Sequence, residues 1–498
     1  MTQAESETAA PEVSLSERTS RGFAWMLAQT LGSKVVGIVN QIFLARLLAP
    51  ADYGLVAIAY MAASLPAVLR QTGIPTILVQ KGDRFDRWAN AAFWMELALG
   101  ALATLLMLAA APVAAWFYHA PILSGLIALI AISAVPNALQ SVPGARLTRD
   151  LCFRELAAIG LGYNLLSASI SVGAAFWGCG AYSFLLPLPL CVTLRGGCYW
   201  RLRPVRVRLN PQFHRWRAMA ADSGRLMAGG IFGIAPGLLK IFALGLFYSQ
   251  AVVGWYSFAG NLSGQVLVLL SANLAGVLFP VLSKLKEDPP RQVAAFFRSA
   301  RALALAGVPL CLAEAVLARP LLLAVFSAKW LPAVPLLTLL ALAAAINIVG
   351  GPAGNLMQAQ GRFHLGMKWS MASAVLFAGL VFAGVKWGGP AWVATADLAC
   401  ALMLTPVFLL SATRPGGGSV SAIAKIYLLP LLFSALALAP AALGEFFCPC
   451  LWAHPWAELA LSAITAPPIY VILVRRFRRA DVDELAERFG KLLRRAVA

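Results

Sequence analysis

Long apolar stretches alternate with short polar or basic breaks over almost all of the 498 residues. A helix needs about 20 apolar residues to cross the hydrocarbon core of a bilayer, and such runs recur from Phe23 to Val474. The pattern therefore predicts an all-α membrane protein with about 14 transmembrane helices. The expected spans lie near residues 22–45, 53–79, 89–117, 121–142, 155–176, 180–200, 226–248, 252–282, 293–317, 333–358, 365–386, 390–411, 421–442 and 456–474.

Lysine and arginine are unevenly divided between alternate loops. If the N-terminus is cytoplasmic, most basic loop residues fall on the cytoplasmic side, and the opposite loops hold only Arg46, Arg319, Lys329 and Lys386. Because basic residues are enriched in cytoplasmic loops, this asymmetry predicts an even number of helices with both termini cytoplasmic. It also explains the net charge of +19, so no nucleic-acid partner is expected.

A weak internal repeat divides the chain. Gly54 and Ala59 are matched two hundred positions later by Gly254 and Ala259, and other matches follow in the same order. The repeat predicts two parallel six-helix bundles, related by an axis along the membrane normal, followed by an extra helix pair. The expected segments are a disordered cytoplasmic tail (1–20), an N-terminal bundle (21–200), a basic cytoplasmic linker (201–220), a C-terminal bundle (221–412), the helix pair (413–476) and an amphipathic cytoplasmic tail (477–498).

The stretch Arg195–Arg225 carries eight arginines and a single acid, Asp222, between two apolar halves of the chain. Such a basic segment is typical of a cytoplasmic connector that fixes topology. Substrate chemistry is therefore expected on the helices that it joins rather than on its arginines.

Charged residues inside apolar spans are costly and mark candidate functional sites. Lys34 in the first helix and Lys240 in the seventh are equivalent by the repeat, and together they would form a cationic cavity suited to an anionic substrate. The alternative is that each snorkels or pairs with a carboxylate such as Glu96 or Asp397. The candidate cavity residues are Lys34, Gln41, Arg70, Lys240, Asn261 and Gln265, and the candidates for charge balance or ion coupling are Glu96, Glu314 and Asp397.

Signatures of enzymes are not apparent in the sequence. The four histidines are scattered without metal-ligand spacing, and no phosphate-binding loop for ATP is present. The cysteines lie mostly in or beside apolar spans and do not form a disulfide framework. No catalytic residue, metal or cofactor is therefore expected.

Several motifs carry a family resemblance. FLARLLAPADYGLVAIA (Phe43–Ala59) resembles the ARxLxPxDFG pattern of bacterial polysaccharide flippases of the MATE-like superfamily. The resemblance continues in Leu244–Leu262, Leu278–Leu285 and Phe326–Leu337, and it covers most of the chain up to about residue 412. One departure is Lys240, five positions before Gly245, where similar members often have an aspartate. This lysine makes the expected cavity more positive and leaves any ion coupling through an acid at that position in doubt.

The resemblance implies a function. Such proteins carry undecaprenyl-pyrophosphate-linked sugar repeat units to the outer leaflet of the inner membrane for O-antigen, capsule or exopolysaccharide synthesis. For this chain, the resemblance implies an inner-membrane flippase that works by alternating access and has no enzymatic activity. Its partners would be the lipid-linked glycan and membrane lipids, with a polysaccharide polymerase and glycosyltransferases as further candidates.

Two alternatives stay open at this point. A multidrug or cation antiporter of the MATE type would share the fold, but its cavity should hold more carboxylates than cations, unlike the set Lys34, Arg70 and Lys240. A membrane polysaccharide polymerase or ligase would need a large extracytoplasmic loop with catalytic residues. The outer loops of this chain are short, which disfavours the enzyme.

Overall fold

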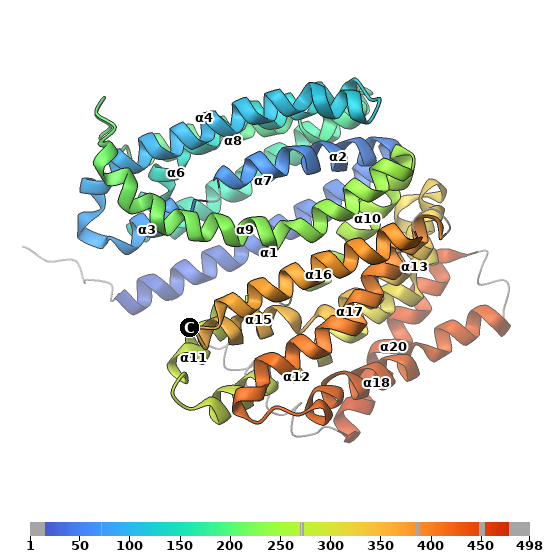
Figure 1. The fold of residues 1–498 in the computed structure, drawn as a ribbon. Coiled ribbons are helices and arrows are strands. Elements are labelled where there is room, and N and C mark those ends of the chain that lie inside the picture. Colours follow the sequence, from blue (N-terminus) through green and yellow to red (C-terminus); the bar gives the residue numbers. More distant parts are fainter. Residues whose placement is uncertain are drawn as a thin grey trace, which may run out of the picture.

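The computed structural model describes residues 15–70, 72–268, 270, 273–384, 388–447 and 454–477, and the regular elements of these segments are helices (Figure 1). Most helices from the first half of the chain gather on one side of the molecule and most from the second half on the other, while α9 packs against both groups. The two groups approach each other where α2 meets α10. The prediction of an all-α protein built from two bundles is confirmed.

Where the structure describes it, the N-terminal half holds eight α-helices and three short 3₁₀ turns. They are α1 (Leu15–Leu47), α2 (Pro50–Ala67), η1 (Val68–Arg70), α3 (Ile74–Gln80), η2 (Gly82–Arg84), α4 (Phe85–Phe117), α5 (Ile122–Ile132), α6 (Ala134–Arg149), α7 (Phe153–Phe176), η3 (Gly180–Phe184) and α8 (Pro187–Leu202).

The C-terminal half repeats this pattern and adds a helix pair. Its elements are α9 (Phe213–Phe247), α10 (Gln250–Leu267), α11 (Asn273–Lys284), α12 (Pro289–Val316), α13 (Ala318–Leu321), η5 (Leu322–Phe326), η6 (Ala328–Ala333), α14 (Val334–Asn347), α15 (Gly350–Ala359), α16 (Phe363–Gly384), α17 (Gly389–Thr413), η7 (Arg414–Gly416), α18 (Val420–Phe447) and α20 (Pro455–Phe477). Helices α18 and α20 pack on each other, and α18 lies against α12.

Ten helical segments in the described part of the chain are long and apolar enough to cross a membrane. The expected spans that fall in α1, α8, α9 and α10 are not among these ten, although the apolar end of α9, Ile234–Phe247, forms a shorter candidate. The ten segments support a membrane protein with many transmembrane helices, and the total of 14 crossings stays a prediction.

Two expected spans in each half are interrupted at equivalent places. In the first half, α2 gives way to α3 through η1 and Gly73, which has a left-handed φ of 66°, and α5 gives way to α6 at Ser133. In the second half, α10 ends at Leu267 before α11, and α14 ends at Asn347 before α15. Left-handed backbone is readily accessible to glycine, which explains Gly73 at the first break. The matching interruptions agree with the internal repeat seen in the sequence.

The two bundles touch most closely at a reciprocal glycine contact. A Cβ atom added to Gly54 on α2 would lie 1.8 Å from the carbonyl oxygen of Gln250, and one added to Gly254 on α10 would lie 1.8 Å from that of Pro50. Only glycine lets two helix backbones approach this far. Residues paired by the sequence repeat therefore meet face to face where the bundles cross.

A second contact joins the end of α1 to the η5–η6 segment, and we call Arg46, Lys329 and Trp330 with their hydrogen bonds the α1–η6 latch. Arg46 donates from Nε to the carbonyl of Val325 at 2.9 Å, and Lys329 Nζ donates to the carbonyl of Arg46 at 2.8 Å. Trp330 is fully buried and donates from Nε1 to the carbonyl of Ala45 at 2.9 Å. Two of the motifs that carry the family resemblance thus bind each other directly.

The connection between the halves is shorter than the expected linker. Helix α8 continues to Leu202 and α9 begins at Phe213, so the non-helical connection covers residues 203–212. The basic residues on either side, including Arg195, belong to helices rather than to a loop. Residues 1–14 and 478–498 lie outside the described residues, and with them lie most of the expected disordered tail (1–20) and of the expected amphipathic tail (477–498). The expectation of disorder is wrong for residues 15–20, which form the first turns of α1.

Candidate functional site

A cavity of about 510 Å³ lies between the bundles, with α2 on one side and α9 and α10 on the other. This volume falls in the range of pockets that hold small ligands. Its polar lining residues are Tyr60, Ser64, Lys240, Tyr256, Ser257 and Asn261. Of the cavity residues expected from the sequence, Lys240 and Asn261 line it directly.

Lys240 forms an ion pair inside the protein. Its Nζ lies 2.6 Å from Oδ1 of Asp397 on α17, and the side chains of the two residues are only 23% and 20% exposed. The same Nζ lies 5.3 Å from the centre of the Phe377 ring. A lysine ammonium has three donors, so the bond to Asp397 leaves donor capacity on the cavity side. The pairing with Asp397, one of the alternatives weighed from the sequence, is therefore present in the structure.

Lys34 has a different partner. Its Nζ donates to Oε1 of Gln265 at 2.9 Å, which joins α1 to α10 across the bundle boundary. Gln265 lies one helical turn beyond Asn261, which lines the cavity, so this bond stands next to the cavity. An amide accepts a hydrogen bond without neutralising a charge. Lys34 has no carboxylate within ion-pairing distance in the described part of the chain.

Arg70 and Glu96 lie together, away from the residues that line the cavity. They interact electrostatically beside the break between α2 and α3. The buried Glu96 accepts a hydrogen bond from the Thr72 hydroxyl, whose oxygen in turn accepts from the backbone N–H of Ile74 at 3.1 Å. Glu96 therefore holds the chain at the helix break.

The remaining candidates are isolated. Gln41 lies partly buried on α1 and makes no side-chain hydrogen bond to another described residue. Glu314 lies near the end of α12, and its Oε2 is buried without a hydrogen-bond partner within the described residues. Neither of them lines the cavity. Over the residues that the structure describes, no group of three histidine, cysteine or acidic side chains is placed to bind a metal ion.

Among the polar lining residues, sequence reasoning missed Tyr60, Ser64 and Tyr256. Tyr60 and Ser64 are four positions apart on α2, a spacing that places them on one helix face. The hydroxyls of Tyr256 and Ser257 are buried and have no partner within the described residues. Buried polar groups normally find a partner in protein or water, so these hydroxyls are available to a ligand or to water.

The two bundles with a polar cavity between them define a membrane protein with the fold of MATE-like transporters. Over 91% of this chain and 99% of the other, the structure is similar to that of the lipid II flippase MurJ in an inward closed conformation, with a TM-score of 0.73 and 13% identity. A multidrug resistance MATE family transporter in an inward-facing conformation gives a TM-score of 0.57 at 15% identity, covering 79% and 96% of the two chains. At these identities the similarity concerns the fold.

The sequence settles the family. The profile of the polysaccharide biosynthesis protein family matches residues 43–335, and the chain belongs to this family. It is 24% identical to the teichuronic acid biosynthesis protein TuaB of Bacillus subtilis over 371 residues, covering 73% of this chain and 76% of TuaB. It is also 24% identical to the lipopolysaccharide biosynthesis protein WzxC of Escherichia coli over 381 residues, covering 73% and 75%. The resemblance in the motifs is thereby confirmed, and the chain is a multi-pass bacterial membrane protein.

Proposed function

We propose that this protein is a flippase that moves undecaprenyl-pyrophosphate-linked oligosaccharide repeat units across the inner membrane for polysaccharide biosynthesis. The family and its relatives in lipopolysaccharide and teichuronic acid biosynthesis support the pathway, and the MurJ-like fold supports the transport of a lipid-linked glycan. The protein would act by alternating access and would carry out no covalent chemistry.

The observation that carries the proposal is the charge balance beside the cavity. Lys240 is paired with Asp397, whereas Lys34 is bonded only to the neutral Gln265. An uncompensated cation in a low-dielectric site attracts an anion strongly. In this scheme Lys34 attracts the pyrophosphate, and Lys240 contributes the donors that Asp397 leaves available.

The lipid tail would stay in the bilayer while the pyrophosphate and sugars enter between the bundles. The proposal includes the expected division into two bundles and a helix pair, with both termini in the cytoplasm. Among the remaining predicted residues, Gln41 is proposed to line the path, and Glu314 to balance charge or couple to an ion. A polysaccharide polymerase and glycosyltransferases are the proposed protein partners.

The test replaces both lysines in a strain that lacks the chromosomal gene. Lys34→Gln combined with Lys240→Gln should lower polysaccharide export at least about 100-fold per amount of protein in the membrane, because two charge-assisted hydrogen bonds contribute about 3–6 kcal/mol together. Export is compared per amount of protein because Lys240→Gln leaves Asp397 unpaired and lowers stability. Undecaprenyl-linked repeat units should accumulate in the cytoplasmic leaflet. Lys368→Gln, which removes an exposed lysine on α16, is the matched control and should export normally. Normal export by the double variant would refute the proposal.

A multidrug antiporter shares the fold, as the MATE structures show, so the fold does not exclude it. Two observations favour the lipid-linked glycan. The family match covers residues 43–335, and the cavity region holds the uncompensated cation Lys34 rather than an unpaired acid. A large cationic drug would be repelled by this charge.

A further inference from the structure

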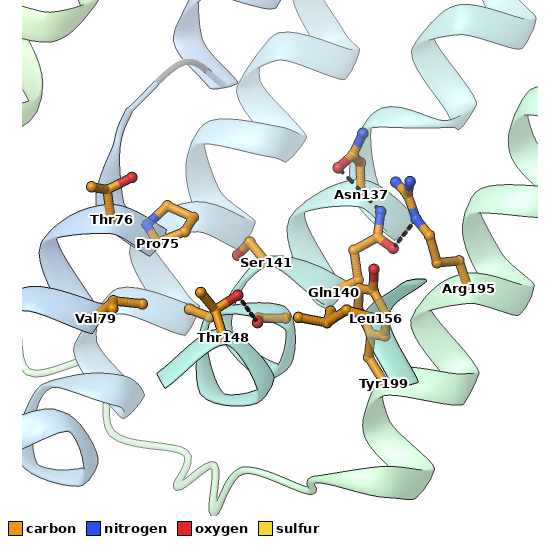
Figure 2. Close-up of a pocket in the computed structure, with 12 residues that line it drawn as sticks. Pro75, Thr76, Val79, Asn137, Gln140, Ser141, Thr148, Leu156, Arg195 and Tyr199 are labelled. Atoms are coloured by element: carbon orange, nitrogen blue, oxygen red, sulfur yellow. Dashed lines mark hydrogen bonds between the residues drawn. The ribbon is translucent and has the colours of Figure 1, made fainter. Parts of the chain in front are cut away.

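A second polar pocket lies inside the N-terminal bundle, formed by α3, α6, α7 and α8 (Figure 2). Its volume is about 440 Å³, and it shares no lining residue with the cavity between the bundles. Its polar side chains come from three helices: Thr76 from α3; Asn137, Gln140, Ser141 and Thr148 from α6; Arg195 and Tyr199 from α8. None of its lining residues is acidic.

Arg195 is held in place at the side of this pocket. Its Nε donates to Oε1 of Gln140 at 2.9 Å, and Nε2 of Gln140 donates to Oδ1 of Asn137 at 3.2 Å, a chain of bonds that Figure 2 shows. The guanidinium also lies 4.5 Å from the centre of the Tyr163 ring. Two neutral contacts, an amide and an aromatic face, fix the orientation of the cation and leave its charge uncompensated.

The donors left over match an anionic ligand with hydroxyl groups. The terminal nitrogens of Arg195 form no hydrogen bond to another described residue. The amide nitrogen of Asn137 is likewise without a described partner. A guanidinium with two exposed nitrogens binds a carboxylate in bidentate fashion, and the surrounding amides and hydroxyls can bind sugar hydroxyls. A phospholipid head group would use the positive charge but few of the neutral polar groups.

Direct contacts join α6 and α8 beside the pocket. Trp200 on α8 donates from Nε1 to the carbonyl of Leu139 on α6 at 3.0 Å, which joins the two helices that carry the hydrogen-bond chain. Tyr199 packs on Gly144, where an added Cβ would lie 3.3 Å from the ring. A pocket whose walls are fixed in this way can discriminate between ligands of similar size.

We infer that this pocket is a recognition site for an acidic sugar of the transported glycan, with Arg195 binding the sugar carboxylate. The inference rests on the proposed function. Pyrophosphate binding and sugar recognition would then take place in different pockets. The cavity between the bundles binds the pyrophosphate common to all such lipid carriers, and the Arg195 pocket recognises a group specific to the glycan. Arg195 belongs to the basic stretch from which no substrate chemistry was expected, and its position on the inner face of α8 gives it this role.

The test compares two lipid-linked disaccharides that differ only in a terminal glucuronate or glucose, bound to the purified full-length protein in nanodiscs. The wild-type protein should bind the glucuronate form about 10-fold more tightly, since one charge-assisted bidentate contact distinguishes the two ligands. Arg195→Gln should reduce this preference to below about twofold, and Arg195→Lys should retain part of it, because a lysine keeps the charge but loses the bidentate geometry. Arg201→Gln, an exposed arginine on the same helix, should behave as the wild type.

Three outcomes would overturn the inference: equal binding of both disaccharides by the wild type, an unchanged preference in Arg195→Gln, or competition at this site by phosphatidylglycerol that Arg195→Gln abolishes. The last outcome would identify a phospholipid site. Undecaprenyl pyrophosphate without sugar separates the two proposals, because it should bind the wild type and Arg195→Gln equally. If it binds neither protein while the glucuronate preference persists, the proposed flippase function fails and the sugar site stands.

Discussion

The glycine contact between α2 and α10 allows a direct test of alternating access. Substituting alanine for Gly54 would place a Cβ atom 1.8 Å from the carbonyl oxygen of Gln250, whereas distances below 3.0 Å are essentially never observed. The helices must therefore separate by about 1.2 Å, the difference between these two distances. Overpacking of this kind costs about 1–3 kcal/mol. If this contact exists only when the outer side is closed, the ratio of outward-open to outward-closed protein should rise by about 5- to 150-fold.

Spin labels on opposite bundles measure this shift. Trp177 at the end of α7 and Phe382 near the end of α16 are both exposed and lie on the expected outer side. With native cysteines replaced, pulsed electron spin resonance between labels at these positions should show a longer distance gaining population in Gly54→Ala and in Gly254→Ala. Gly264→Ala is the matched control on α10, because nothing lies within 4 Å of its added Cβ atom.

The control also removes a confounding effect. Alanine stabilises a helix interior by up to about 1 kcal/mol relative to glycine wherever it is placed, so this contribution is present in all three variants. Distance distributions that match the wild type in both Gly54→Ala and Gly254→Ala would refute the assignment of this contact to the closed outer side.

Three further predictions concern single contacts. Asp397→Asn should destabilise the protein by about 3–5 kcal/mol because it leaves Lys240 charged and unpaired, and adding Lys240→Gln should restore most of the thermal stability; a double variant as unstable as the single one would contradict the pairing. Glu96→Gln should keep the melting temperature, since an amide oxygen still accepts from Thr72, whereas Glu96→Ala should lower it by the equivalent of about 1–3 kcal/mol; equal losses would show that the charge is the stabilising feature. Lys329→Met should weaken the α1–η6 latch by about 1.5–3 kcal/mol and lengthen the distance between spin labels at positions 177 and 382. An unchanged distance would show that the latch does not hold the outer side closed.

The fold was accessible from the sequence because a membrane protein displays its helices as apolar runs of a required length. Matched residues at a nearly constant spacing indicate the repeat, and they pair Gly54 with Gly254. The contact between the two glycines could not be predicted. A sequence repeat shows which residues are equivalent in the two bundles, but it does not show which of them lie on the axis between the bundles.

The site was only partly accessible for a related reason. Charge within an apolar span identified Lys34 and Lys240, but their partners lie 231 and 157 positions away along the chain. Such pairings depend on helix crossing and rotation, which hydrophobicity does not encode. Arg195 was missed because a basic stretch at a helix end is ordinarily a topology signal. The rotation of α8 turns the Arg195 side chain inward. The sequence does indicate a polar face on α6, because helical spacing places four residues on one side of that helix: Asn137, Gln140, Ser141 and Gly144.

The α1–η6 latch has a consequence for genetics. Its donors are the side chains of Arg46, Lys329 and Trp330, whereas its acceptors are main-chain carbonyls. A point mutation can delete a side chain but leaves every carbonyl in place. A selection for variants that open this face should therefore recover changes at the three donor positions, whereas conservative substitutions at the acceptor residues Val325 and Ala45 should stay silent. Both segments contribute to the contact, but point mutations can remove it only at the residues that donate the hydrogen bonds.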